Sequence, residues 1–387
     1  MPGGLTGVPA LAGRLRVVPA APLSEALQSS RRDWAARLAV GQPADRFPGL
    51  MGSVFNLCSQ AHRVCAQLAV HAALPHLPGP LDEVAQRLCA ETAQEHIRRM
   101  GLDWPRLLST ADNAARMADA QLSLGRCPVL SAPGSLAAWE ATQAWLEAEW
   151  LDLPAALWEA RWQADGVAWL AEWASQRHGW LPTLLHAARG ADVPCGVDAN
   201  SALPVPVDDD SMQVWAAALH GDRGFALAPS WQGRCAHTGN WTRLNGCRPV
   251  GALTPWGLLG SRLSELIRLV WHGKGHLSDE PTLAYGSCQT GERCGLAWVE
   301  MARGLLVHQV SFQSGPGEDK VETCQVVAPT EWNFHPHGVV AQFIAGLDGG
   351  LPAAMLDAQA RLLMAAFDPC VPFDIATPHV PVEVEHA

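Results

Sequence analysis

Residues 24–188 space their apolar side chains as amphipathic helices do, and this long helical stretch constrains the fold more than any other feature of the sequence. The first turn of a helix tolerates a missing amide proton, and prolines occupy three such positions, at Pro80, Pro105 and Pro154. Gly166 is a candidate break in the last helix. The pattern predicts helices over Ser24–Val40, Phe47–Ala73, Pro80–Leu102, Pro105–Leu124, Ser135–Trp150 and Pro154–Arg177.

The rest of the chain carries shorter signals. Residues 189–256 hold clusters of Gly, Pro and Asp, including the acidic triplet Asp208–Asp210, which indicate loops and short strands. Glycines punctuate the next segment, Gly273–Gly295. Outside these regions we expect an edge strand within Leu11–Val18, helices at Ser261–Trp271 and Pro352–Phe367, and a strand pair at Gly304–Phe312 and Val321–Val327.

These elements predict a predominantly helical α+β fold with a long-helix core and small β elements. We expect one domain over residues 1–387, helical over 24–188, loop-rich over 189–256 and mixed α/β over 257–387. With 48% apolar and only 17% charged residues, a chain of 387 residues can bury the large core that such a domain needs.

Charge and hydropathy exclude several kinds of partner. Lysine and arginine number 27 against 38 acidic residues, a net charge of −11, and no basic run is long enough to follow a phosphate backbone, so nucleic acid is not expected. No segment approaches the roughly 20 apolar residues of a membrane span, and prolines and glycines interrupt the N-terminus where a signal peptide would be apolar. We expect a cytoplasmic protein without membrane insertion.

The 11 cysteines are dispersed, and a reducing cytosol favours free thiols or metal ligands. Cys58 and His62 stand four residues apart, which on one helix face points both at one metal or one proton. Asp368-Pro369-Cys370 ends a helix at a proline-stiffened turn. Each pattern alone also fits an ordinary packed thiol. No CxxC pair exists, so a zinc site is not favoured.

Four short blocks, taken in order, resemble the large subunit of nickel-iron hydrogenases. That family carries C-x-x-C-x-x-x-H near its N-terminus, a block like E-x-P-R-G followed by a strand with a histidine, P-T-x-W-N, and a C-terminal D-P-C-x-x-C-x-x-H. A looser match is His237 to Arg243, where many relatives begin with E-T-G, and the resemblance covers about residues 11 to 380. The blocks in this chain are Cys58–His62, Glu300–Gly304 with His308, Pro329–Asn333 and Asp368–Cys370.

The departures from that family are specific. Phe55 replaces the first cysteine of the N-terminal pair, and Phe373 replaces the second cysteine of the C-terminal pair. Phenylalanine cannot coordinate a metal, so the four-thiolate nickel site of the family cannot be built here and no nickel is expected. Ala12-Gly13-Arg14 stands where the family has an E-G-H motif whose glutamate relays protons. We therefore do not expect a hydrogenase, nor any enzyme.

The pattern of losses is similar to that of HupK/HoxV-type maturation proteins, thought to hold an iron with two cyanides and one carbon monoxide before it passes to the apo-hydrogenase. The resemblance implies Cys58 and Cys370 as the iron ligands and Arg303 as a hydrogen-bond donor to a cyanide nitrogen. It assigns His62 as a donor near a diatomic ligand.

In the same pocket the resemblance places Glu300 and Asn333, with His308, as supports. The partners implied are a hydrogenase large subunit and other hydrogenase maturation proteins. Two alternatives stay open: a metal-free chaperone that keeps its cysteines by descent, and a divergent hydrogenase. The iron-holding hypothesis requires the helices near residues 47 to 124 to pack beside the C-terminal helix and bring Cys58 and Cys370 together.

Overall fold

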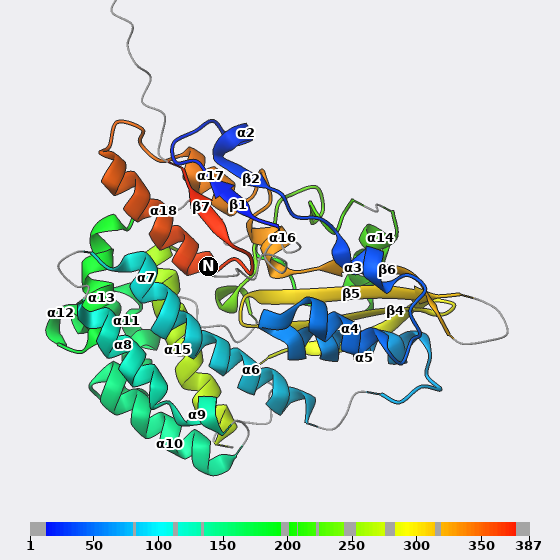
Figure 1. Ribbon diagram of the computed structural model, residues 1–387, viewed down its shortest axis with the longest axis horizontal. Helices are drawn as coiled ribbons and strands as arrows, with labels where there is room; N and C mark the ends of the chain where they lie inside the picture. Colours follow the sequence, from blue (N-terminus) through cyan, green and yellow to red (C-terminus); the bar gives the residue numbers. More distant parts are fainter. Residues whose placement is uncertain are drawn as a thin grey trace, which may run out of the picture.

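The 19-residue helix α15 (Pro255–Gly273) runs through the helical part of this computed structural model (Figure 1). Its side chains are buried almost all round, as expected of a helix inside a core. Thr254 caps its start, since the Thr254 hydroxyl accepts the Gly257 N–H at 3.0 Å, and Pro255 occupies the first turn. Helices α6, α10 and α18 pack against α15.

The surrounding helices have the following bounds: α6 (Val84–Arg98), α7 (Trp104–Leu108), α8 (Ala115–Gly125), α9 (Pro128–Ser131), α10 (Leu136–Leu146), α11 (Ala155–Asp165), α12 (Val167–Gln176), α13 (Trp180–Ala188) and α18 (Ala353–Phe367). π-Helical turns follow α6 at Arg99–Asp103 and α10 at Glu147–Leu151. The structure describes residues 13–79, 83–110, 115–132, 135–194, 201–206, 208–221, 224–243, 253–274, 283–313 and 319–376.

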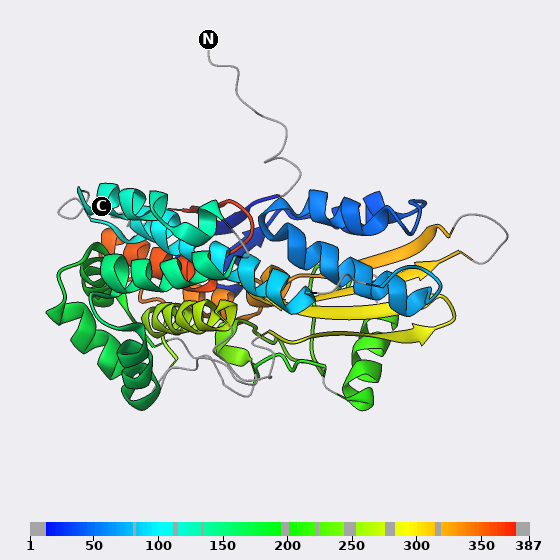
Figure 2. The ribbon, with the colours of Figure 1, turned by 90° about the horizontal axis from the view of Figure 1, so that it is seen from below.

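The other half of the molecule is a four-stranded antiparallel sheet in the order β3 (Tyr285–Gly291), β4 (Cys294–Met301), β5 (Gly304–Phe312) and β6 (Val321–Val327). Helices α4 (Phe47–Val54) and α5 (Ser59–Ala73) lie over one face, and the green helix α14 (Asp209–Gly221) lies on the opposite side (Figure 2). The two central strands are therefore buried almost throughout. The approach of α5 is so close that a Cβ at Gly295 would lie 2.0 Å from the Ala69 carbonyl oxygen.

A small sheet joins the two ends of the described chain. Its order is β2 (Leu27–Ser29), β1 (Leu15–Val17) and β7 (Phe373–Ile375), with β1 antiparallel to β2 and parallel to β7. This pairing anchors the segment that follows α18, including Cys370. The remaining helices are α2 (Leu23–Ala26), α3 (Trp34–Ala39), α16 (Pro329–Asn333) and α17 (Val339–Ala345).

The predominantly helical α+β class is confirmed, and several predicted elements match closely. The C-terminal helix begins and ends within a residue of the prediction, and so do the strands β5 and β6. Ser135 caps α10, as its predicted starting position required, because its hydroxyl accepts the Ala138 N–H. Gly166 separates α11 from α12. Within the described ranges no helix is long and apolar enough to cross a membrane.

Four predicted helices are wrong in extent. The helix expected at Ser261–Trp271 begins already at Pro255 and ends at Gly273. Residues Ser24–Val40 form a helix, a strand and a second helix, because β2 pairs with β1 instead of continuing a helical turn. Phe47–Ala73 breaks at residues 55–58. Pro105–Leu124 is divided between α7, which ends at Leu108, and α8. The predicted helix start at Pro80 lies outside the described residues.

The β predictions were incomplete. The strand near the N-terminus lies in the middle of the small sheet, not at its edge. The glycine-punctuated segment Gly273–Gly295 contains β3 and the start of β4, so the expected strand pair belongs to a sheet of four. The acidic triplet Asp208–Asp210 opens helix α14, where the Asp208 carboxylate caps the helix by accepting the Ser211 N–H at 2.8 Å.

The packing expected around the C-terminal helix is only partly right. Helix α7 lies against α18, as predicted. In contrast, α4 and α5 cover the four-stranded sheet.

Candidate functional site

Cys58 and Cys370 line one cavity of about 420 Å³, although 312 positions separate them in the chain. Cys58 reaches it from the break between α4 and α5, and Cys370 from the turn after α18. The cavity walls also contain Arg31, Phe55 and Glu331. The structure thus brings the two sequence-predicted iron ligands to a single space.

The position of Cys58 is set by how α5 begins. A short 3-10 turn, Asn56–Cys58, precedes the helix, so Cys58 occupies the N-cap position of α5 without a side-chain cap hydrogen bond. The prediction that Cys58 and His62 share a helix face is therefore wrong. Glu91 of α6 accepts the Gln60 and Ala61 N–H groups, each at 2.8 Å, and so satisfies the exposed amides of the first turn. Burial raises the pKa of the Cys58 thiol well above its usual range, and the nearby Arg303 only partly opposes this rise.

The Cys370 turn is held by its neighbour Asp368, the last residue before the proline. Asp368 adopts a left-handed conformation with φ of 47°, and its buried carboxylate lies within 2.9–3.3 Å of Arg262, Arg99 and Arg303. Burial alone would raise the pKa of Asp368, but the three guanidinium groups hold it well below its usual range. At Cys370 itself, Thr330 donates its hydroxyl to the sulfur at 3.1 Å.

Arg303 is buried in the tight turn between β4 and β5. Its Nη2 donates to Glu95 at 3.0 Å and its Nε to the Asp368 carbonyl oxygen at 3.2 Å. Burial disfavours the charged guanidinium, but Asp368, Glu95, Cys58 and Cys370 together raise the Arg303 pKa above its usual value. Its Nη1 is buried without a hydrogen-bond partner among the described residues. Arg303 does not line the cavity, but it lies within electrostatic range of both thiols.

His62 pairs with His308 across the interface between α5 and β5. The His62 Nδ1 and His308 Nε2 atoms lie 3.1 Å apart, and burial lowers both pKa values, that of His308 to about 3. Both imidazoles are therefore neutral at pH 7. Phe55 stacks on His62 with ring centres 3.8 Å apart, so the residue that replaces a family cysteine fills space beside this pair.

Glu300 and Asn333 do not line the cavity, and each hydrogen-bonds to backbone groups outside its wall. The Asn333 side chain binds both the N–H and the carbonyl oxygen of Thr238, at 2.9 and 2.8 Å. Thr238 in turn accepts the Leu305 N–H at 2.9 Å, which secures the turn that carries Arg303. Glu300 accepts the Ala284 N–H at 2.8 Å and lies beside Arg243.

Sequence reasoning missed Arg31 and Glu331, which form an ion pair of 2.7 Å in the cavity wall. Burial disfavours the charge on Arg31, but Glu331, Cys370 and Cys58 raise its pKa. Glu331 stands inside the block Pro329–Asn333, so that block offered a signal. Arg31 offered none, because it was placed within the helix predicted over Ser24–Val40.

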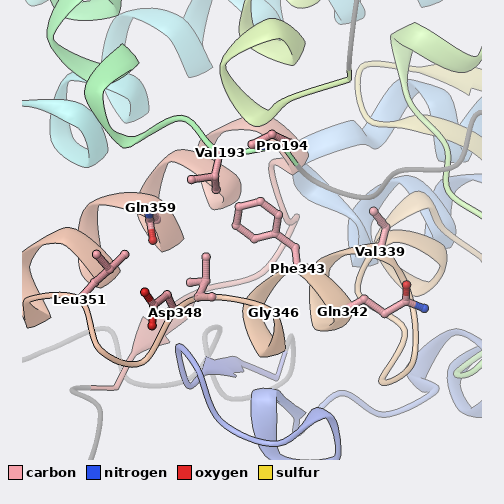
Figure 3. A pocket seen from close by; sticks show the side chains of 10 residues that line it. Val193, Pro194, Val339, Gln342, Phe343, Gly346, Asp348, Leu351 and Gln359 are labelled. Carbon is pink, nitrogen blue, oxygen red and sulfur yellow. The ribbon is translucent and has the colours of Figure 1, made fainter.

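A second cavity of about 430 Å³ lies between α17, α18 and the segment near Val193 (Figure 3). Phe343 and Leu351 form part of its wall, and Gln359 of α18 points into it. It contains none of the residues predicted to carry chemistry. In the part of the chain that the structure describes, no group of three or more His, Cys, Asp and Glu side chains is arranged to hold a metal ion.

Comparison with known proteins gives a consistent picture, although no family model matches the chain. The hydrogenase expression/formation protein HoxV of Cupriavidus necator is 36% identical over 383 residues, which cover 96% of this chain and 97% of that protein. The hydrogenase expression/formation protein HupK of Rhizobium leguminosarum bv. viciae is 29% identical over 367 residues, covering 91% and 92%.

Solved structures agree on the fold. The nickel-iron-selenium hydrogenase of D. vulgaris Hildenborough aligns with a TM-score of 0.52 at 15% identity, covering 89% of this chain and 92% of that one. An NAD+-reducing nickel-iron hydrogenase aligns with a TM-score of 0.51 at 15% identity, covering 89% and 91%. The chain has the fold of a nickel-iron hydrogenase large subunit and belongs to the HoxV/HupK family of hydrogenase expression/formation proteins.

Proposed function

We propose that this protein acts in the cytoplasm as a non-catalytic scaffold that holds an iron carrying two cyanides and one carbon monoxide, bound through Cys58 and Cys370. The observation that carries the proposal is the meeting of these two thiols in one cavity, with Arg303 in electrostatic range of both. The recipient would be the apo large subunit of a nickel-iron hydrogenase, and other maturation proteins would supply the fragment.

The ligand count suits a temporary holder. Three diatomic ligands leave the iron only two or three open positions, which two soft thiolates can largely fill. Phe55 and Phe373 occupy the positions where the enzyme family has the other two cysteines, so a four-thiolate nickel site cannot form there. Two protein bonds hold the cargo less firmly than four, which favours release to an acceptor.

Residues of this chain also fit the cargo electrostatically. A ferrous iron with two cyanides and two thiolates carries a net charge of minus two, and buried negative charge requires cationic or hydrogen-bonding neighbours. Arg303 lies within electrostatic range of both thiols and its buried Nη1 has no partner among the described residues, so its positive charge would offset that of the cargo.

Infrared spectroscopy of protein purified without air, with iron analysis, tests the proposal. Cyanide and carbonyl stretches should be present in the wild type and disappear in Cys58→Ala and in Cys370→Ala. Cys235→Ala is the matched control, because Cys235 is half-buried outside the cavity and its loss should leave the bands unchanged.

Two results would overturn it. A wild-type protein that binds the apo large subunit but shows no diatomic bands would be a metal-free chaperone. About one nickel per chain would mark a divergent hydrogenase.

A further inference from the structure

Arg31 contributes a cationic group directly to the wall of the cysteine cavity. Arg31 stands in the segment between β2 and α3. Its side chain is only 11% exposed although it is charged. One arm of the guanidinium contacts Glu331 at 2.7 Å, while Nη1 is buried with no hydrogen-bond partner among the described residues. A buried charged donor left unpaired is costly, so this atom points to a ligand that the cavity receives.

Helix α16 contacts both Arg31 and the Cys370 sulfur. Its consecutive residues Thr330 and Glu331 hold the two groups separately: Thr330 donates to the Cys370 sulfur at 3.1 Å, and Glu331 fixes Arg31. Both thiols also lie within electrostatic range of the Arg31 guanidinium. A species bound to the two sulfurs would therefore lie beside an arginine that Glu331 holds in place and whose Nη1 has no hydrogen-bond partner among the described residues.

We propose that Arg31 is a second cargo-binding residue, which donates from Nη1 to an anionic ligand on the iron and selects anionic metal fragments over aquated cations. This inference rests on the proposed function. Glu331 neutralises one side of the guanidinium and orients its plane, which leaves the other side for a cyanide nitrogen. A hydrated divalent cation offers Nη1 only coordinated waters, which are poor acceptors, whereas a dicyano fragment presents anionic acceptors to it.

Infrared spectra of Arg31→Gln test the inference, because a cyanide stretch reports directly on hydrogen bonding to its nitrogen. We expect a shift in at least one cyanide band and about tenfold less retained iron fragment, the effect of losing one charged hydrogen bond. The matched control is Arg16→Gln, which removes the same charge from an exposed arginine of β1 that does not line the cavity. It should change neither quantity.

A second variant guards against loss of folding. Arg31→Lys keeps the charge but loses the planar fork, so it should retain an intermediate amount of fragment with a shifted cyanide band. The inference is overturned if Arg31→Gln and Arg31→Lys match the wild type, or if Arg16→Gln has an equal effect. A wild type without diatomic bands would remove the proposed function as well. Normal wild-type bands with unchanged Arg31 variants would remove this inference alone.

Discussion

Replacing Asp368 with Asn isolates the charge that holds the Cys370 turn. The residue has a φ of 47°, a conformation that Asn adopts as readily as Asp, so the backbone should not change. The substitution removes the carboxylate charge that faces Arg262 Nη1 at 2.9 Å, Arg99 Nε at 3.2 Å and Arg303 Nε at 3.3 Å. It also turns an amide N–H₂ toward one of these cations.

The expected cost is large. Removing one partner of a buried ion pair costs about 3–5 kcal/mol, a substantial part of the ~5–15 kcal/mol that stabilises an ordinary protein. Asp374→Asn provides the control. Asp374 makes a comparable ion pair with Arg14 at 2.6 Å, but both side chains are more than half exposed, and such pairs contribute only ~0–1 kcal/mol.

Urea unfolding followed by tryptophan fluorescence gives the free energy of unfolding of both variants. Asp368→Asn should lower the unfolding midpoint strongly at unchanged slope, while Asp374→Asn stays near the wild type. If the two substitutions lower the free energy of unfolding by the same amount, within about 1 kcal/mol, the buried arginine cluster does not stabilise the turn.

Three further predictions follow from the supports of the site. Glu91→Ala should destabilise the protein by about 1 kcal/mol because Gln60 and Ala61 lose their acceptor, whereas Glu91→Gln, which keeps one oxygen, should lose less in thermal denaturation. Asn333→Ala should cost about 1–3 kcal/mol and speed hydrogen exchange of the Thr238 amide; unchanged exchange would contradict the clamp. Because burial lowers the pKa of His308 from 6.5 to about 3, the unfolded chain takes up a proton here below pH 6.5 while the folded chain does not. The contribution of His308 to stability is therefore complete above pH 6.5 and falls on acidification, by about 2 kcal/mol at pH 5. His308→Gln should be less acid-sensitive by that amount in unfolding experiments at pH 7 and 5, and an equal loss in both proteins would refute the assignment.

Local patterns in the sequence were sufficient for elements that have a strong preference for one backbone conformation. The periodicity of residues 353–367 predicts a helix and the apolar run in Gly304–Phe312 predicts a strand, and the structure has both. The family motifs likewise singled out Cys58 and Cys370, and the structure brings both to one cavity. That these thiols bind a metal stays a prediction.

Tertiary contacts decided the remaining features. The helical pattern of Phe47–Ala73 continues through residues 55–58, yet Glu91 from another helix caps a new start at α5 and gives Cys58 its position. Strand β3 forms within a glycine-rich segment of weak strand propensity, because β4 supplies its hydrogen-bond partners.

Arg31 shows the difference most clearly. Its own neighbours in the sequence predicted a helix, but Leu27–Ser29 pairs with β1, and β1 pairs with β7 from near the other end of the chain. That pairing ends the helix early, and α16 then supplies Glu331 to hold the arginine in the cavity wall. A sequence pattern reports what a segment can do alone, whereas a backbone hydrogen bond or ion pair to a residue hundreds of positions away exists only after the chain has folded.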